Sequence, residues 1–216
     1  MCLILSNTMS KVILNTAYFP PVQYLACVNR YDEVGIEQWE SYGKQSYRNR
    51  CEILSANGIL SLTVPVKKTN EVKFLTKEAC IDYSTRWQKL HFKGIESAYK
   101  NSPYYDYYME DFIPFFEKKE KYLLDLNTAI LETVLGILQI RRSLVFTTDY
   151  QTYPEEVCDM RGVIHPKPAR QEKEDILFKA KPYTQTFADR FPFTPDLSIL
   201  DLPVSYTHLR AHETPE

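Results

Sequence analysis

Residues 18–66 concentrate side chains that can bind an anion and orient a polar ligand. Three cations fall within residues 44–50, just before a predicted hairpin. A guanidinium binds phosphate or carboxylate through two parallel hydrogen bonds, and an ammonium binds phosphate as a point charge. The stretch therefore predicts an anion-binding site. Its predicted ligand-binding residues are Tyr18, Gln23, Lys44, Arg48, Asn49 and Arg50.

A solvated basic edge is the alternative interpretation, because charges on an edge strand discourage pairing with further strands. Lys67 and Lys68, just past the other end of the same hairpin, fit both interpretations equally well. Around Arg48, by contrast, Tyr47 and Asn49 add planar and amide groups that can orient a ligand. We therefore favour a binding role for the arginines of this stretch.

A second group of reactive side chains lies near the end of a long turn-rich segment. It comprises Asp159, Arg161, His165 and Lys167. Residues two apart in an extended chain share a side, so Asp159 can fix Arg161 for bidentate anion binding. Pro166 keeps His165 extended, so that His165 and Lys167 share a side of the chain. His165 is the predicted general base, and Lys167 belongs to the same predicted catalytic group. The alternative is an exposed Asp159–Arg161 ion pair with little effect on stability.

His91 has a different sequence context. It follows Trp87 and precedes Ile95 at helical spacing, so its imidazole falls on the apolar stripe of a predicted helix. Its position there favours a hydrogen-bonded core histidine over a catalytic base.

Composition excludes several classes of protein. The 216 residues carry 26 basic and 28 acidic side chains, a formal net charge of −2, which disfavours nucleic acid as a partner. The five cysteines form no C-x-x-C pair, which indicates neither a disulfide framework nor a metal site and favours a reducing cytoplasm. The six glycines form no dinucleotide-binding or P-loop motif, and no cofactor is identified.

Both ends of the chain are set apart from the domain. Residues 203–216 look like a translated sequencing-library adaptor, and residues 1–8 like an extension before the start at Met9. A single domain is therefore expected over residues 9–202. No apolar run reaches the roughly 18 residues that a membrane span needs.

The spacing of apolar residues predicts an α/β fold with a βαβ-type start, a mixed sheet, an inserted hairpin and a helical layer. A strand at residues 11–15, a helix at 22–31 and a strand at 34–38 form the βαβ unit. Asn57-Gly58 lies between the two strands of a hairpin at 51–54 and 59–66. A short strand is expected at residues 79–83. The remaining predictions are helices at 85–102, 105–116 and 122–140, a strand at 144–147, a long loop at 150–175, and closing helices at 177–190 and 197–202.

This βαβ unit would place Tyr18 and the Pro20-Pro21 pair at the carboxyl end of the first strand. Open α/β sheets bind their ligands at that edge. The fold prediction and the site prediction therefore agree on one region of the molecule.

Several blocks of sequence carry a resemblance to a known family. They include Tyr18-Phe-Pro-Pro-Val-Gln-Tyr24, Lys44-Gln-Ser-Tyr-Arg-Asn-Arg50, Trp87-Gln-Lys-Leu-His91 and Asp159-Met-Arg161. With these blocks the chain resembles the WbqC-like family over residues 9–201. The family is associated with bacterial O-antigen and other surface-glycan gene clusters and is suggested to include a glycine transferase acting on sugars. Where many relatives have a His-Gln-Pro run this chain has Leu14-Asn-Thr-Ala-Tyr18, so no catalytic role passes to that position.

The resemblance and the two clusters together predict a cytoplasmic enzyme of glycan biosynthesis. It would transfer an acyl or aminoacyl group, such as glycyl, to a nucleotide-linked or lipid-linked amino sugar. Arg48 and Arg50 would hold the phosphate, Asp159 would orient Arg161, and His165 would act as base. The alternative is a non-catalytic protein that binds a glycan precursor or a pathway partner. A nucleotidyltransferase-like activity rests only on the first βα turn, a fold-level analogy.

Overall fold

The computed structural model describes residues 11–68, 73–102, 105–167, 171, 175 and 178–202. Residues 1–8 and 203–216, where the sequence predicts an extension and an adaptor-derived tail, lie outside the described residues.

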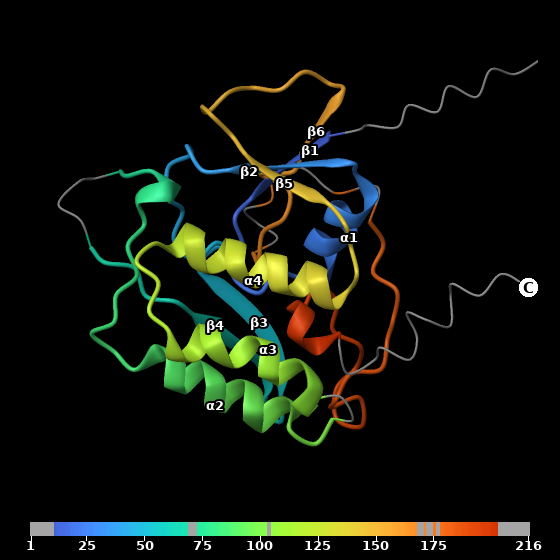
Figure 1. The fold of residues 1–216 in the computed structure, drawn as a ribbon. Helices are drawn as coiled ribbons and strands as arrows, with labels where there is room; N and C mark the ends of the chain where they lie inside the picture. The colour runs from blue at the N-terminus through green and yellow to red at the C-terminus, as the bar shows by residue number, and fades with distance from the viewer. Residues whose placement is uncertain are drawn as a thin grey trace, which may run out of the picture.

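A four-stranded parallel sheet forms one half of the folded molecule (Figure 1). Its strands are β1 (Lys11–Asn15), β2 (Glu33–Glu37), β5 (Ser143–Phe146) and β6 (Val157–Asp159), in the order β5-β2-β1-β6. Every neighbouring pair is parallel. All four strands therefore end at the same edge, and β1 is flanked on both sides.

The predicted βαβ start is confirmed, with α1 (Val22–Arg30) between β1 and β2. Pro21 is the N-cap of the helix and is extended; proline is tolerated at a helix start because the amide proton that it lacks would have no partner within the helix. The hydroxyl of Tyr24 donates to the carbonyl of Asn15 at 2.9 Å, which fixes α1 against the end of β1.

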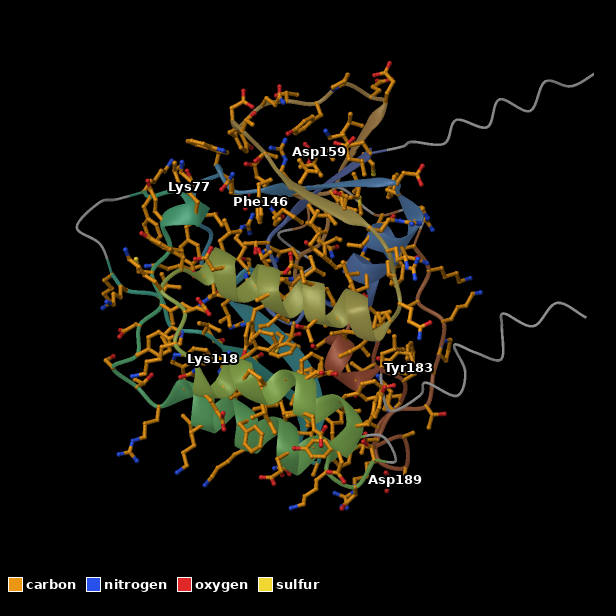
Figure 2. All side chains as sticks on the ribbon, in the orientation of Figure 1. Lys77, Lys118, Phe146, Asp159, Tyr183 and Asp189 are labelled. Atoms are coloured by element: carbon orange, nitrogen blue, oxygen red, sulfur yellow. The ribbon has the colours of Figure 1, made fainter. Side chains whose placement is uncertain are left out.

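The hairpin and three helices form the other half of the folded molecule. The hairpin is β3 (Arg50–Ser55) with β4 (Gly58–Thr63), and the helices are α2 (Trp87–Tyr99), α3 (Tyr105–Glu117) and α4 (Leu123–Ile137). In Figure 1, α4 runs between the parallel sheet and the layer that holds the hairpin, α2 and α3. Figure 2 shows side chains filling the space between these layers. One continuous cluster of buried apolar residues joins both halves.

The α/β class is thus confirmed, with parallel and antiparallel pairing in two separate sheets. The predicted hairpin also forms, with Ala56 and Asn57 in the turn between the paired residues Ser55 and Gly58, and Gly58 adopts a φ of 100°, which favours glycine. Isolated bridges at Cys80 and Ile81 stand in place of the short strand predicted at residues 79–83. Within the described ranges, no helix is both long and apolar enough to cross a membrane.

Two predictions of local structure were wrong. Residues 178–190, the described part of a predicted helix at 177–190, form turns and irregular chain, and the helix predicted at 197–202 is only a 3-10 turn, Ile199–Asp201. Pro182 lies inside the first segment and removes the amide proton that a helix would need. The predicted loop at 150–175, in turn, contains the strand β6, which pairs with β1.

Candidate functional site

Polar side chains follow all four parallel strands at the edge where these strands end. Asn15 and Glu37 are the last residues of β1 and β2, Asp159 is the last of β6, and Thr147 directly follows β5. Asn15 and Glu37 are register partners. Because the strands are parallel, groups that are far apart in the sequence meet here, at the edge where open α/β sheets bind ligands.

Arg161 lies at the centre of the first set of contacts. Its Nε donates to Asp159 Oδ1 at 2.9 Å, its Nη2 donates to Asp159 Oδ2, and its Nη1 donates to Glu37 Oε2 at 2.8 Å. The guanidinium carbon lies 4.7 Å from the ring centre of Tyr150 and 5.1 Å from that of Tyr153. The hydrogen bonds that Arg161 donates to Asp159 raise the pKa of Arg161 above its ordinary value, so its positive charge is fixed.

Glu37 is completely buried, and each of its oxygens has a partner. Oε1 accepts from the Thr147 hydroxyl at 3.0 Å and from the backbone amide of Trp39 at 2.7 Å, while Oε2 accepts from Arg161. A buried charge is tolerated when it is paired and hydrogen-bonded in this way. Glu37 therefore ties Arg161 to the ends of β2 and β5.

A second ion pair lies across from the first. Arg48 donates from Nε and Nη2 to the two oxygens of Glu40, and Asn15 Nδ2 donates to Glu40 Oε2 at 2.8 Å. The side chains of Arg48 and Glu40 are only 12% and 10% exposed. Asn127 on α4 donates from its side chain to the backbone carbonyl of Arg48 at 2.8 Å, which fixes the backbone of Arg48 against α4.

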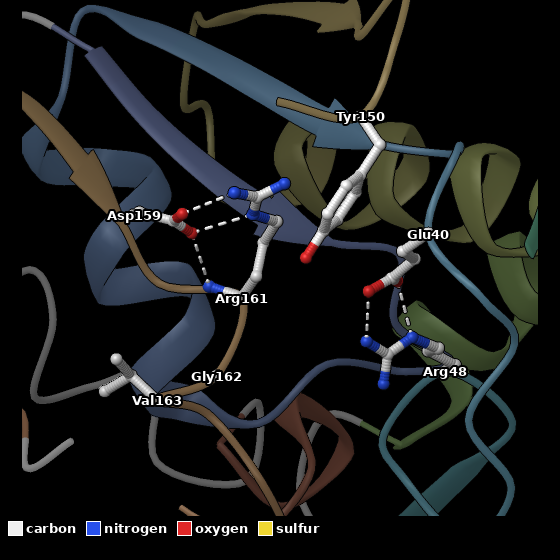
Figure 3. A pocket seen from close by; sticks show the side chains of 7 residues that line it. All are labelled: Glu40, Arg48, Tyr150, Asp159, Arg161, Gly162 and Val163. Carbon is white, nitrogen blue, oxygen red and sulfur yellow. Dashed lines mark hydrogen bonds and ion pairs between the residues drawn. The ribbon is translucent and has the colours of Figure 1, made fainter. Parts of the chain in front are cut away.

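A pocket of about 190 Å³ lies between the two ion pairs. Figure 3 shows the Tyr150 hydroxyl pointing into the space between Arg161 and Glu40. The pocket is lined by Glu40, Arg48, Tyr150, Asp159, Arg161, Gly162 and Val163. With Glu37 behind Arg161, three carboxylates face two guanidiniums, so this set of groups carries a net charge of −1.

Of the predicted site residues, Arg48, Asp159 and Arg161 line this pocket. Asn49 donates from its side chain to the carbonyl of Val64, and Arg50 lies 4.0 Å from Glu52. Both therefore support the start of the hairpin.

Tyr18 and Gln23, two more of the predicted ligand-binding residues, lie away from the pocket lining. The Tyr18 hydroxyl is hydrogen-bonded to His91 Nδ1 at 2.9 Å in the core. His91 is thus placed as the sequence predicts for a core histidine, and it is 5% exposed. Gln23 donates from its side chain to Asp175 at 3.0 Å.

Lys44, His165 and Lys167 do not line the pocket. We call the two loops that carry them the rim: Lys44 follows Gly43, which lies next to the Arg48 guanidinium, and His165 and Lys167 follow the pocket-lining Val163. Lys167 Nζ donates to Gln45 Oε1 at 2.9 Å, which joins the loop after Gly162 to the loop after Gly43. His165 Nδ1 accepts from the Lys167 amide at 3.0 Å. The catalytic roles predicted for His165 and Lys167 stay predictions.

Several residues of the site were not predicted from the sequence. Glu40 and Tyr150 line the pocket, while Asn15, Glu37 and Thr147 form hydrogen bonds or ion pairs that hold its charged side chains. A usable signal existed for Glu37, because a carboxylate at the carboxyl end of a buried strand of a βαβ unit lies where ligands bind. Thr147 and Tyr150 follow β5, and their place at the site depends on the pairing of β5 with β2, which cannot be read from the sequence. Among the described residues, no group of three or more histidine, cysteine or carboxylate side chains could hold a metal ion.

The fold and the pocket define an α/β protein with a charged pocket at the carboxyl edge of a parallel sheet. The family model of the WbqC-like protein family matches residues 16–164, more than half of the chain, and the chain belongs to this family. It is 28% identical over 145 residues to the uncharacterized protein Rv1507c of Mycobacterium tuberculosis. That match covers 66% of this chain and 62% of the relative, so the chain spans less than two thirds of that protein. No solved structure matches the chain.

Proposed function

We propose that the protein is an enzyme of glycan biosynthesis that transfers an acyl or aminoacyl group to the amine of an activated amino sugar. The observation that carries the proposal is the convergence of the Arg48–Glu40 and Arg161–Asp159 pairs, about a hundred residues apart in sequence, on one pocket at the carboxyl edge. A single pocket with convergent polar groups is the default place for a reaction.

The reaction forms a bond between the amine nitrogen and the carbonyl carbon of the donor. The bond from that carbon to the donor's oxygen or sulfur breaks, the leaving group takes the electron pair, and the amine gives up a proton. Asp159 and Glu40 offer acceptor oxygens to the amine, while Arg161 and Arg48 hold these two carboxylates in fixed orientations. His165, three residues beyond Gly162 on the same loop, remains the predicted general base.

Mass spectrometry tests the proposal directly. The purified protein is incubated with amino-sugar phosphates and with aminoacyl or acyl donors, and the sugar is expected to gain the mass of the transferred group. Asp159→Asn is expected to lower the rate by about a hundredfold or more, in the range of lost acid/base and orienting groups. Lys93→Gln, an exposed change on α2, serves as the matched control and is expected to leave the rate unchanged. Tight binding of the sugar without any mass gain would instead identify a non-catalytic binding protein.

A further inference from the structure

We infer that the pocket and its rim form one bipolar site, in which the pocket binds the amino group of a sugar and the rim binds the phosphate on the same sugar. This inference rests on the proposed function, since it names the part of the substrate that each half of the site takes. It also differs from the expectation that Arg48 holds phosphate.

The two guanidiniums of the pocket are already committed to carboxylates. All three nitrogens of Arg161 donate, to Asp159, Glu37 and the carbonyl of Gln151. Arg48 uses Nε and Nη2 on the two oxygens of Glu40, which leaves Nη1 as its remaining donor nitrogen. A phosphate in the pocket would have to compete with the bidentate Arg48–Glu40 pair, which is about nine tenths buried, and with the bidentate Arg161–Asp159 pair.

Glu40, by contrast, keeps capacity to accept a further hydrogen bond. An ionised carboxylate has about four acceptor positions on its two oxygens. Glu40 receives three hydrogen bonds, one from Asn15 and two from Arg48. Asp159, at 33% exposure, is the most exposed charge among the two ion pairs, whose other members are near 10%. A pocket that presents carboxylates to its ligand selects hydrogen-bond donors, and an ammonium best of all.

The rim has the opposite charge. Lys44 and Lys167 are exposed, and neither forms an ion pair with any residue that the structure describes. Lys167 is held toward Gln45, the residue after Lys44, by the 2.9 Å hydrogen bond. Gln45 adopts a φ of 58°, a backbone conformation that glycine accepts more easily than glutamine. The two basic residues thus come from loops that are joined beside the pocket.

The size of the pocket agrees with a substrate bound in two parts. A volume of about 190 Å³ is the liquid volume of roughly six water molecules, below the usual range for a whole ligand of drug size. It accommodates a group of about the size of one sugar ring. The phosphate and whatever it carries then lie outside, where the lysines are.

Isothermal titration calorimetry with three small probes tests this arrangement without requiring turnover. Glucosamine 1-phosphate carries both charges, glucose 1-phosphate lacks the amine, and N-acetylglucosamine 1-phosphate has the amine blocked. We expect glucosamine 1-phosphate to bind at least about tenfold more tightly than the other two, the effect of one charge-assisted hydrogen bond. Equal affinities for the three probes would overturn the inference.

Two variants assign the two halves of the site. Glu40→Gln is expected to weaken glucosamine 1-phosphate about tenfold and to leave glucose 1-phosphate unchanged. Lys167→Gln is expected to weaken both phosphates about threefold to fivefold, as for an exposed charge pair, while Lys93→Gln changes neither. If Glu40→Gln instead tightens glucose 1-phosphate, Arg48 is the phosphate-binding group and the inference is wrong.

The outcomes separate this inference from the proposed function. Preference for the amine without any product in the mass assay refutes the transferase and keeps the bipolar site; product without preference for the amine does the reverse. Competition by uridine diphosphate or by a prenyl diphosphate then tells whether the phosphate on the rim belongs to a nucleotide or to a lipid carrier.

Discussion

Protonation of His91 is expected to destabilise the protein between about pH 6.5 and about pH 4. Burial lowers the pKa of His91 from 6.5 to about 4, against a smaller opposing effect of a backbone hydrogen bond with Thr63. A neutral imidazole whose Nδ1 accepts from the Tyr18 hydroxyl carries its proton on the other nitrogen, and this tautomer fits the backbone hydrogen bond with Thr63. The neutral ring is satisfied on both sides, and a second proton would displace one of these contacts.

The sign follows from which state binds the proton first. The unfolded chain protonates near pH 6.5 and the folded protein only near pH 4, so the free energy of unfolding falls as the pH decreases through this window. Each pH unit inside the window costs about 1.4 kcal/mol, which gives a loss of about 2 kcal/mol between pH 7 and pH 5. A loss of this size is a large fraction of the typical stability of a domain.

Urea unfolding at the two pH values measures this effect. His91→Gln keeps a donor and an acceptor at the position but does not titrate, so it is expected to lose about 2 kcal/mol less than the unchanged protein on going from pH 7 to pH 5. Tyr18→Phe is the matched control: it removes the hydroxyl on Nδ1 and lowers stability at both pH values. Because burial is the main cause of the shift, it retains the pH dependence. Equal losses in the unchanged protein and His91→Gln would refute the reasoning.

Three further predictions concern the supports of the pocket and the hairpin. Glu37→Ala leaves Arg161 without its buried partner and is expected to cost about 3–5 kcal/mol in urea unfolding, whereas a cost below about 1 kcal/mol would show that Glu37 does not hold Arg161. Asn127→Ala removes the donor to the Arg48 carbonyl and to the Thr16 hydroxyl and is expected to cost about 1–3 kcal/mol; an unchanged urea midpoint would contradict this. Gly58→Ala places a side chain at a φ of 100° and is expected to cost at least about 1 kcal/mol, with Ser61→Ala on the same hairpin as a control near zero; equal effects would argue against backbone strain.

The elements with strong local signals were predictable from the sequence. Asn57-Gly58 lies between alternating residues, and the hairpin forms around it. The apolar stripe of α4 has helical spacing over four turns, and its predicted ends differ from the observed ones by only a few residues. In both cases the residues that decide the structure are neighbours along the chain.

The strand β6 shows why the remainder could not be predicted. It has three residues, too few for any periodic pattern, and among the described strands it pairs with β1, more than a hundred residues away. Without β6 the sequence gives no reason to place Asp159 beside β1. From the sequence alone, the prediction that Arg48 and Arg161 lie close together rests on the assumption that both are at the carboxyl edge of the sheet, and not on a known strand order.

The same ladder explains how the charges of the pocket came to be paired. Met160 donates from its amide to the carbonyl of Ile13, so the register set by β6 continues to the residue before Arg161. That register brings the guanidinium within reach of Glu37 on β2, two strands away. A sequence shows Arg48 and Arg161 as cations open to a ligand, because their partners Glu40 and Glu37 are recognisable only once the strands are in order. In the folded protein both arginines are paired with carboxylates, and under our inference this pairing reverses the charge of the ligand that the pocket is expected to bind.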